Sequence, residues 1–351
     1  MCKLKSAIIL KDRIFMPDYD SHSKMLEELG ITDDYINASK VFVRAELSPA
    51  DGDAFSDIDG WEFSVDQDIT PEWFDEKDCA ERMRKAVKEW AKTHIFIGQN
   101  ELKISHGENI FIKDCKNVDI RGNATVKHIC GNATVENICD NATVKSICDN
   151  ATVKSICGNA TVENIYGNAT VKYIYGNATV KYIYGNATVK NIYGNATVEN
   201  ICGSTTVESI YGNATVEYIY GNATVKNICG NTTVERIYDN AKVERICDNA
   251  KVESIYGNAT VKYIYGNATV KNIYGNATVE SIYDNATVEC VRGNATVKYI
   301  YDNVTVISSP YTKWNNSASL IISDNATFKD CYSKTIYQAG GWKLVEVKKG
   351  K

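Results

Sequence analysis

The chain has 351 residues, and 44% of them are hydrophobic, a share typical of a folded protein. The longest unbroken apolar run, residues 7–10, is far too short to span a bilayer, and the first residues lack the pattern of a signal peptide. Residues 1–100 carry 13 Lys and Arg against 21 Asp and Glu, so the totals of 39 and 44 leave 26 and 23 for the rest. We therefore expect a cytoplasmic protein with no membrane contact, and this near-balance of charge argues against nucleic acid as a partner.

Residues 1–98 contain no repeat and are predicted to form a small α+β domain. Short stretches rich in β-branched and aromatic residues predict strands at 7–15, 38–47, 61–65 and 95–97. Helices are predicted at 21–29 and 78–93, and Thr70 before Pro71 has the pattern of a helix start. We expect this domain to cap the remainder of the chain or to tether it to a partner.

Residues 122–306 are dominated by a nine-residue unit resembling Gly-Asn-Ala-Thr-Val-Lys-Tyr-Ile-Tyr. From Val126 to Val306 every ninth residue is a valine, an alanine usually lies two places before it, and an isoleucine almost always lies three places after it. This spacing fits neither a helical stripe nor a simple alternating strand. It predicts a parallel β-solenoid with a core of Ala, Val and Ile, so the fold class is mainly β.

Each unit is predicted to contain two short strands, with a bend between the valine and the isoleucine. The Gly-Asn or Asp-Asn pair then closes the unit, because these residues adopt turn conformations readily. Two units per coil is the preferred closure, since nine residues hardly encircle a core, and three units per coil is the alternative. Residues 99–121 are predicted to be a degenerate capping coil, and residues 307–351 a C-terminal cap with a last strand at 342–347.

The outward positions of the array carry many tyrosines, which are expected to form rows along the rod. A row of exposed rings is able to bind sugars or a protein, although stacking of the rings on one another is sufficient to explain it. The candidate interaction surface consists of Tyr173, Tyr175, Tyr182, Tyr184, Tyr263 and Tyr265.

Most of the twelve cysteines occupy the repeat position where tyrosine is the usual residue. A residue that exchanges with tyrosine is not an obligatory disulfide partner, and nine-residue spacing is not that of zinc-binding motifs. We therefore expect reduced thiols. With two units per coil, Cys130 and Cys148 would nevertheless stack within reach of a disulfide.

Catalytic, cofactor and metal sites are not predicted. The four histidines show no metal-binding or nucleophile pattern, and no phosphate-binding loop is present. The acidic segment 51–60 has neither the spacing nor the closing glutamate of a calcium loop, so we interpret it as a solvated loop. If the N-terminal domain were an enzyme, the residues to examine would be its carboxylates, Asp51, Asp53, Asp57, Asp59, Asp66 and Asp68.

The Asn-Ala-Thr-Val array, together with residues 5–20 and 61–73, resembles nonapeptide-repeat β-solenoid proteins of gut bacteria and their phages. The resemblance covers nearly the whole chain. It implies a β-helical architecture and a mobile-element context, but no activity and no site residue.

The first functional hypothesis is a non-enzymatic structural or interaction protein. Its N-terminal domain would bind a partner, most simply a protein, and its rod would act as a spacer or display surface. The alternative is a glycan-binding or virion-associated adhesion module that uses the tyrosine rows. The sequence predicts neither the partner nor the oligomeric state.

Overall fold

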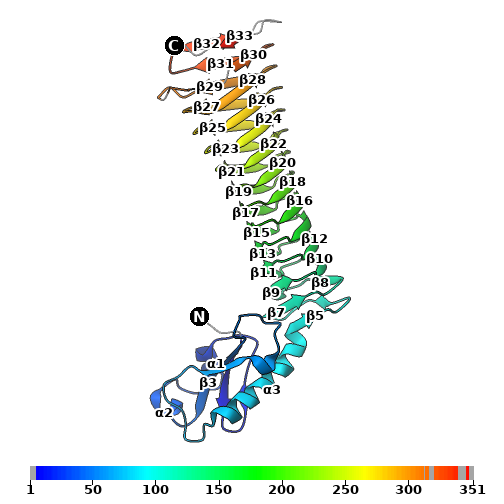
Figure 1. Ribbon diagram of the computed structural model, residues 1–351, viewed down its shortest axis with the longest axis vertical. Coiled ribbons are helices and arrows are strands. Elements are labelled where there is room, and N and C mark those ends of the chain that lie inside the picture. The colour runs from blue at the N-terminus through cyan, green and yellow to red at the C-terminus, as the bar shows by residue number, and fades with distance from the viewer. Residues whose placement is uncertain (1–4, 312, 316–319, 339–344, 348–351) are drawn as a thin grey trace.

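The computed structural model describes residues 5–311, 313–315, 320–338 and 345–347. A small α+β domain at the N-terminus lies against one end of a long rod of stacked strands (Figure 1). The predicted fold class is confirmed, because the rod is a parallel β-solenoid and the protein is mainly β.

The N-terminal domain is built on a four-stranded antiparallel sheet in the order β2-β1-β3-β4. The elements are β1 Lys5–Leu10, β2 Ile14–Phe15, α1 His22–Glu28, α2 Tyr35–Ala38, β3 Phe42–Ser48, the 3-10 helix η1 Ile58–Gly60, β4 Glu62–Val65 and α3 Glu76–His94. Helix α3 packs the apolar side chains of Met83, Val87 and Trp90 against the sheet, as expected from their helical spacing.

The helix predicted at 78–93 is α3, which begins two residues earlier at Glu76, and no helix begins at Thr70 and Pro71. Its N-cap is Asp75, whose carboxylate accepts the backbone N–H of Asp78 at 2.8 Å. Thr70 and Pro71 instead precede a turn in which Phe74 N–H donates to the Pro71 carbonyl at 2.9 Å. The aspartate cap satisfies one of the free N–H groups of the first helical turn, which proline cannot do.

The solenoid consists of two sheets, and from β5 to β31 the chain alternates between them with each strand. One sheet contains β5 Ile95–Ile97, β7 Ile110–Lys113, β9 Thr125–Cys130, β11 Thr143–Ile147, β13 Thr161–Ile165, β15 Thr179–Ile183, β17 Thr197–Ile201, β19 Thr215–Ile219, β21 Thr233–Ile237, β23 Lys251–Ile255, β25 Thr269–Ile273, β27 Thr287–Val291, β29 Thr305–Ser308, β31 Thr327–Asp330 and β32 Thr335–Gln338. The other contains β6 Lys103–Ile104, β8 Val118–Ile120, β10 Thr134–Ile138, β12 Thr152–Ile156, β14 Thr170–Ile174, β16 Thr188–Ile192, β18 Thr206–Ile210, β20 Thr224–Ile228, β22 Lys242–Ile246, β24 Thr260–Ile264, β26 Thr278–Ile282, β28 Thr296–Ile300, β30 Leu320–Ile322 and β33 Val345–Val347. Parallel pairing joins residues 18 apart, which confirms two units per coil.

The predicted two-strand unit is wrong, because each unit forms one strand of five residues. In β14 the pairing with β16 joins the Thr170, Val171, Tyr173 and Ile174 positions to the next coil but skips Lys172. This irregularity breaks the alternation of the strand, so valine and isoleucine three residues apart both face inward. The irregularity lies where the bend was expected.

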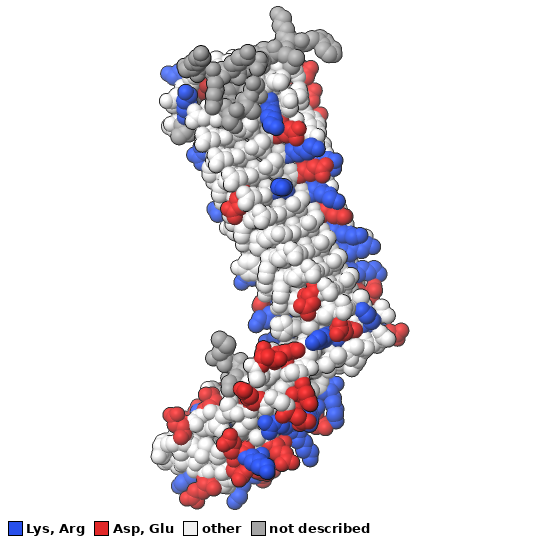
Figure 2. All heavy atoms as spheres, in the orientation of Figure 1, with Lys and Arg blue, Asp and Glu red and all other residues white. Residues whose placement is uncertain are grey.

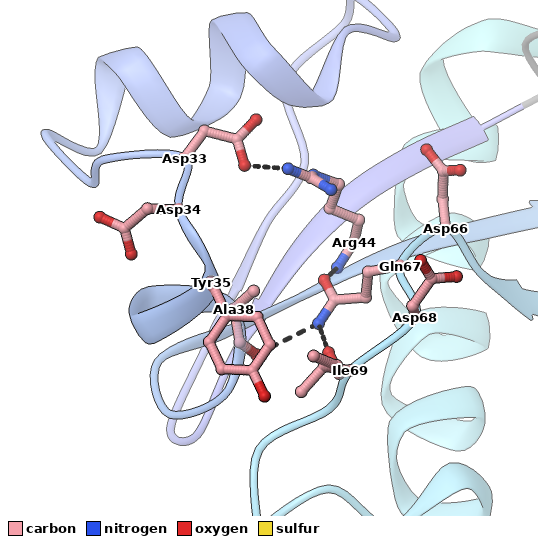
Figure 3. A pocket seen from close by; sticks show the side chains of 9 residues that line it. All are labelled: Asp33, Asp34, Tyr35, Ala38, Arg44, Asp66, Gln67, Asp68 and Ile69. Atoms are coloured by element: carbon pink, nitrogen blue, oxygen red, sulfur yellow. Dashed lines mark hydrogen bonds and ion pairs between the residues drawn. The ribbon is translucent and has the colours of Figure 1, made fainter.

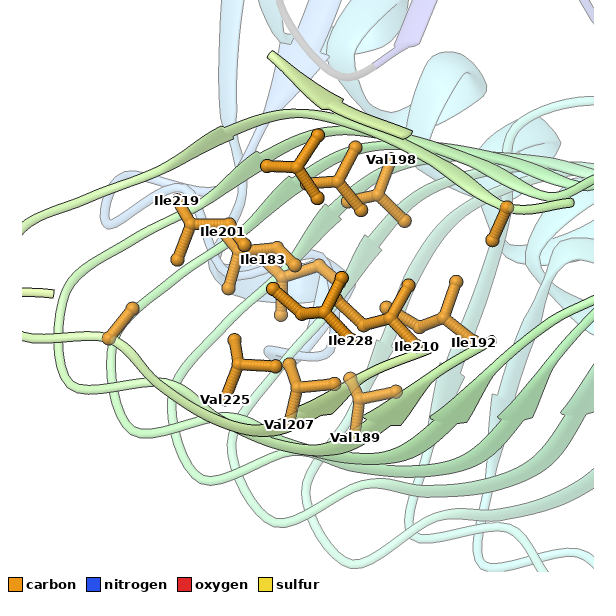
Figure 4. Packing of buried hydrophobic residues seen from close by; sticks show 14 of the residues in the cluster. Ile183, Val189, Ile192, Val198, Ile201, Val207, Ile210, Ile219, Val225 and Ile228 are labelled. Atoms are coloured by element: carbon orange, nitrogen blue, oxygen red, sulfur yellow. The ribbon is translucent and has the colours of Figure 1, made fainter. Parts of the chain in front are cut away.

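The core of the rod is a narrow layer of Ala, Val and Ile between the two sheets. Isoleucines from both sheets lie between two rows of valines, as Ile183 and Ile192 do between Val189 and Val198 (Figure 4). These side chains are completely buried. Every coil therefore covers the apolar surface of its neighbours, which is the main source of stability in a solenoid.

The turns between strands stack as regularly as the strands. The residue after the Tyr or Cys that follows each strand adopts a left-handed conformation, with φ of 72° at Gly176 and 56° at Asp149. The following asparagines form ladders in which Nδ2 donates to Oδ1 of the asparagine 18 residues earlier, at 3.2 to 3.5 Å. Such ladders link successive coils along most of the rod.

Both ends of the rod are covered. At the N-terminal end β5 pairs with β7, so residues 95–97 belong to the solenoid and not to the preceding domain, and Phe111 of β7 is buried in the core of that domain. At the C-terminal end β32 and β33 pair in antiparallel fashion with β31 and β30. The described part of the predicted last strand is β33, and residues 342–344 lie outside the described residues.

Charged residues of both signs gather over the N-terminal domain and, on the visible face of the rod, mainly toward one edge (Figure 2). Three Lys–Glu pairs join neighbouring coils, among them Lys154 Nζ and Glu136 Oε2 at 2.8 Å. These pairs are exposed and screened by solvent, so they contribute little to stability. Among the described residues no helix has the length and apolar character needed to cross a membrane.

Candidate functional site

An acidic pocket lies in the N-terminal domain beside the short helix α2. Its volume is about 460 Å³. The segment before α2, the helix itself, β3 and the chain after β4 contribute the lining residues, which are Asp33, Asp34, Tyr35, Ala38, Arg44, Asp66, Gln67, Asp68 and Ile69 (Figure 3).

Gln67 holds three of the segments around the pocket together. Its Oε1 accepts the backbone N–H of Arg44 at 2.8 Å, and its Nε2 donates to the carbonyls of Phe42 and Ile69 at 3.1 and 2.6 Å. A further contact reaches the Ala38 carbonyl of α2 at 3.3 Å. The amide thus fixes the floor of the pocket by satisfying backbone groups that have no strand partner.

Four carboxylates and a single guanidinium line this pocket. Asp33 forms an ion pair with Arg44, and the Asp34 carboxylate caps α2 by accepting the Asn37 N–H at 2.8 Å. Asp66 Oδ2 lies 3.1 Å from His22 Nδ1. The pocket therefore carries net negative charge and suits a cationic group.

The acidic residues singled out from the sequence separate into two places. Asp66 and Asp68 line the pocket. The other four lie on the 51–60 loop: Asp51 and Asp57 accept backbone N–H groups two residues on, Asp59 pairs with Lys88 Nζ at 2.5 Å, and Asp53 pairs with Lys113 Nζ at 3.7 Å. Their carboxylates shape the loop and its ion pairs instead of converging on one point.

His22, Glu46 and Asp66 place three possible ligand atoms within 4.8 Å of one another. Both ring nitrogens of His22 are already used, since Nε2 lies 3.2 Å from the Ala45 carbonyl and Nδ1 faces Asp66. This arrangement explains the position of the histidine without a metal ion.

Two large apolar side chains next to the pocket are open to solvent. Tyr35 and Ile36 of α2 are 71% and 65% exposed. The sequence analysis predicted neither helix α2 nor a site at Asp33 and Arg44. A helix of four residues has too few positions to show a helical periodicity. The signal that was present is Asp34, an N-cap residue type directly before the helix.

The six predicted tyrosines do not form one surface. Tyr173 and Tyr263 lie on strands of one sheet, whereas Tyr182 lies on a strand of the opposite sheet. Tyr175, Tyr184 and Tyr265 follow their strands, in the two columns that run along the edges of the rod.

The rings in the edge columns are stacked on each other. Tyr193 is parallel to Tyr175 and Tyr211, with ring centroids 5.1 and 5.0 Å apart, and Tyr173 meets its edge at 6.2 Å. Burial raises the pKa of the Tyr193 hydroxyl. The stacked faces are therefore covered by other rings of the protein. This agrees with the structural explanation of the tyrosine rows, in which the rings stack on one another.

The prediction of reduced thiols is wrong for four cysteines. Disulfides join Cys139 to Cys157 and Cys229 to Cys247, each between neighbouring coils of one edge column, with Cα atoms 4.7 Å apart. The Cα–Cα distance between equivalent residues of neighbouring coils lies within the range that a disulfide requires. The 18-residue separation was the signal in the sequence, and it becomes decisive only once two units are known to form a coil.

No family model, curated protein or solved structure matches the chain in the three comparisons made.

Proposed function

We propose that this protein is a non-enzymatic interaction protein, in which the N-terminal domain binds a protein partner and the solenoid serves as a spacer or display surface. The observation that carries the proposal is the pairing of the acidic pocket with the exposed side chains of Tyr35 and Ile36. An exposed apolar pair beside concentrated charge is typical of a recognition surface. The partner segment we propose is basic, with an apolar residue beside its Lys or Arg.

The way the domain joins the rod supports a spacer role. Phe111 of β7 is 3% exposed and packs with Trp90 and Val87 in the core of the N-terminal domain. Asn109 Nδ2 donates to the Asp18 carbonyl, and His94 Nε2 lies 3.1 Å from Asp18 Oδ1. A shared core of this kind holds the domain in a fixed orientation relative to the rod.

The carboxylates of the pocket favour recognition over catalysis. Asp34 is used as a helix cap and Asp33 as the partner of Arg44. A general acid or base needs a carboxyl group that is free to gain and lose a proton. A surface that attracts a cationic partner needs only negative charges in fixed positions.

The test is a selection of displayed peptides on the full-length protein. We expect enrichment of peptides with Lys or Arg next to an apolar residue, and loss of their binding in Asp68→Asn and in the double variant Tyr35→Ser, Ile36→Ser. Tyr311→Ser is the matched control, because Tyr311 is 90% exposed near the far end of the rod. Binding that survives both pocket variants and is lost in the control would place recognition on the rod.

A glycan-binding or virion-associated adhesion module is the second candidate. Sugar rings bind to the faces of aromatic rings, and stacking covers both faces of rings inside the edge columns, such as Tyr193. The alternative therefore rests on tyrosines such as Tyr182, which is 36% exposed with Lys181 Nζ 5.8 Å from its ring. A glycan array is expected to give signals that Tyr182→Ser removes, and an empty array would contradict this candidate.

A cytoplasmic location, expected from the sequence, stays a prediction. The two disulfides weigh in favour of the virion-associated alternative, because disulfides persist on virion and cell surfaces and are rare in the cytosol.

A further inference from the structure

A third pair of cysteines has the geometry of the two disulfides. Cys130 and Cys148 are separated by 18 residues in the edge column opposite that of the bonded pairs, and both are free thiols. Cys148 N–H donates to the Ile129 carbonyl at 2.9 Å, the same bond that the second cysteine makes in each bonded pair. The backbone register therefore places these two residues one above the other in neighbouring coils, as it places the residues of the bonded pairs.

The surroundings of this pair differ from those of the other two. The two thiols line a cavity of about 250 Å³ beneath the loop 52–55 of the N-terminal domain, together with Lys113, His128 and Asp149. Cys130 and Cys148 are only 7% and 6% exposed, so a reagent has to approach them through this cavity.

The two thiols are not equivalent. Cys130 Sγ donates to the Ile112 carbonyl at 3.7 Å. The neighbouring Cys130 thiol, together with Tyr166, lowers the pKa of Cys148 although burial opposes this effect. The same interaction raises the pKa of Cys130. Cys148 is therefore the thiol of the pair that ionises more readily, and such a difference is typical of a nucleophilic and a resolving cysteine.

We propose that Cys130 and Cys148 form a thiol–disulfide exchange site that takes a low-molecular-weight disulfide, RSSR. The Cys148 thiolate attacks one sulfur of RSSR, the S–S bond breaks, and RS⁻ leaves. Cys130 gives its proton to the departing RS⁻ and attacks the Cys148 sulfur, which expels the second RS⁻, and this takes up the proton that Cys148 had lost to solvent. Overall, two cysteine thiols and RSSR yield one new disulfide and two RSH.

The consequence is a covalent link between the two coils next to the N-terminal domain. Oxidation ties β9 to β11 beneath the loop 52–55, and reduction releases them. This site is independent of the acidic pocket, so either proposal can fail without the other.

The tryptic peptides of the full-length protein test the exchange directly. Cleavage after Lys127, Lys145, Lys154 and Lys172 gives peptides 128–145, 146–154 and 155–172. The Cys139–Cys157 bond links the first peptide to the third, whereas a Cys130–Cys148 bond adds 146–154 to the same species. The linked pair 128–145 with 155–172 serves as the internal reference.

After treatment with oxidised glutathione and blocking of free thiols, we expect peptide 146–154 in the linked species, and its release after reduced glutathione. In Cys130→Ser, glutathione is expected to remain on Cys148, whereas Cys148→Ser gives no adduct on Cys130 in the same time. Cys202→Ser is the control, because Cys202 lies in the same column without a neighbouring cysteine. Full alkylation of peptide 146–154 after oxidised glutathione, or a bond that reduced glutathione does not open, would overturn the proposal, and neither readout requires a variant.

Discussion

At the scale of single residues, the left-handed turn position decides which substitutions the repeat accepts. A Cβ added at Gly194, where φ is 70°, would lie 3.0 Å from the backbone nitrogen of Gly176 in the preceding coil. Aspartate occurs at the same position elsewhere, and the Asp149 carboxylate accepts the Gly131 N–H at 3.0 Å. The side chain of aspartate thus compensates for its Cβ by binding the preceding turn.

We expect Gly194→Ala to lower the free energy of unfolding by about 1 to 2 kcal/mol, because alanine has the left-handed strain and the close contact without a compensating bond. Gly194→Asp is expected to cost clearly less. Guanidinium unfolding of the two variants and the parent measures the difference. Equal losses would show that the carboxylate bond contributes nothing.

Asp119 in β8 links the capping coil to the array and should make stability depend on pH. Burial alone would raise the pKa of Asp119, but hydrogen bonds from Arg121 and Asn137 outweigh it and lower the pKa below the ordinary 3.8. A lowered folded-state pKa stabilises the protein above that ordinary value, and the contribution is lost as the pH falls through the folded-state pKa. We expect Asp119→Asn to be less stable than the parent at pH 7 and the gap to close below about pH 4. A gap that is constant from pH 7 to pH 3 would contradict this assignment.

At the scale of elements, the asparagine ladders contain a natural interruption. Ser204 occupies the turn position between Asn186 and Asn222, with the same backbone bond as its neighbours, from its N–H to the Gly185 carbonyl at 2.8 Å. Ser204→Asn should complete the ladder and stabilise the rod by about 0.5 to 1.5 kcal/mol for each hydrogen bond gained. The midpoint of guanidinium unfolding should therefore rise.

Asn195→Ser is the matched control in the uninterrupted ladder. Asn195 donates to Asn177 and accepts from Asn213, both at 3.3 Å, so its replacement removes two ladder bonds. We expect a fall in the midpoint similar in size to the rise in Ser204→Asn. A fall in both variants would mean that the ladders are a by-product of the turn geometry.

The elements show where sequence reasoning succeeds and where it stops. Val and Ile at a spacing of three, as in Val171 and Ile174, predicted an irregular inward face, and both are buried. The spacing does not reveal that the chain stays extended across Lys172, because skipping one pairing position has the same inward pattern as a bend. In the N-terminal domain, Thr70 and Pro71 have the pattern of a helix start but begin no helix, whereas the helix predicted at 78–93 is present with Asp75 as its N-cap.

At the scale of the whole molecule, the repeat predicted the rod but not its connections. Near-identical units specify parallel stacking, and closure by two units follows from core volume. The contact of Phe111 with the N-terminal domain and the pocket around Arg44 depend on residues that occur once in the chain. Periodicity carries no information about such positions, so they emerge only from the three-dimensional structure.

The rod should shorten in steps of one coil. Deletion of residues 167–202 removes 36 residues, which are two coils of 18, and joins Tyr166 to Gly203 in the correct phase of the repeat. Since bridged coils have Cα atoms 4.7 Å apart, we expect the maximum dimension in small-angle X-ray scattering to decrease by about 9 Å, with β-rich circular dichroism retained.

Deletion of residues 167–197 removes 31 residues and breaks the phase, so the alanines, valines and isoleucines after the junction would no longer stack on those before it. We expect this variant to lose the shortened-rod profile and to unfold at lower denaturant concentration from the junction onward, because each coil is stable only while its neighbours cover its core. Equal tolerance of the two deletions would mean that the coils do not depend on register, and would contradict the stacked core as the source of stability.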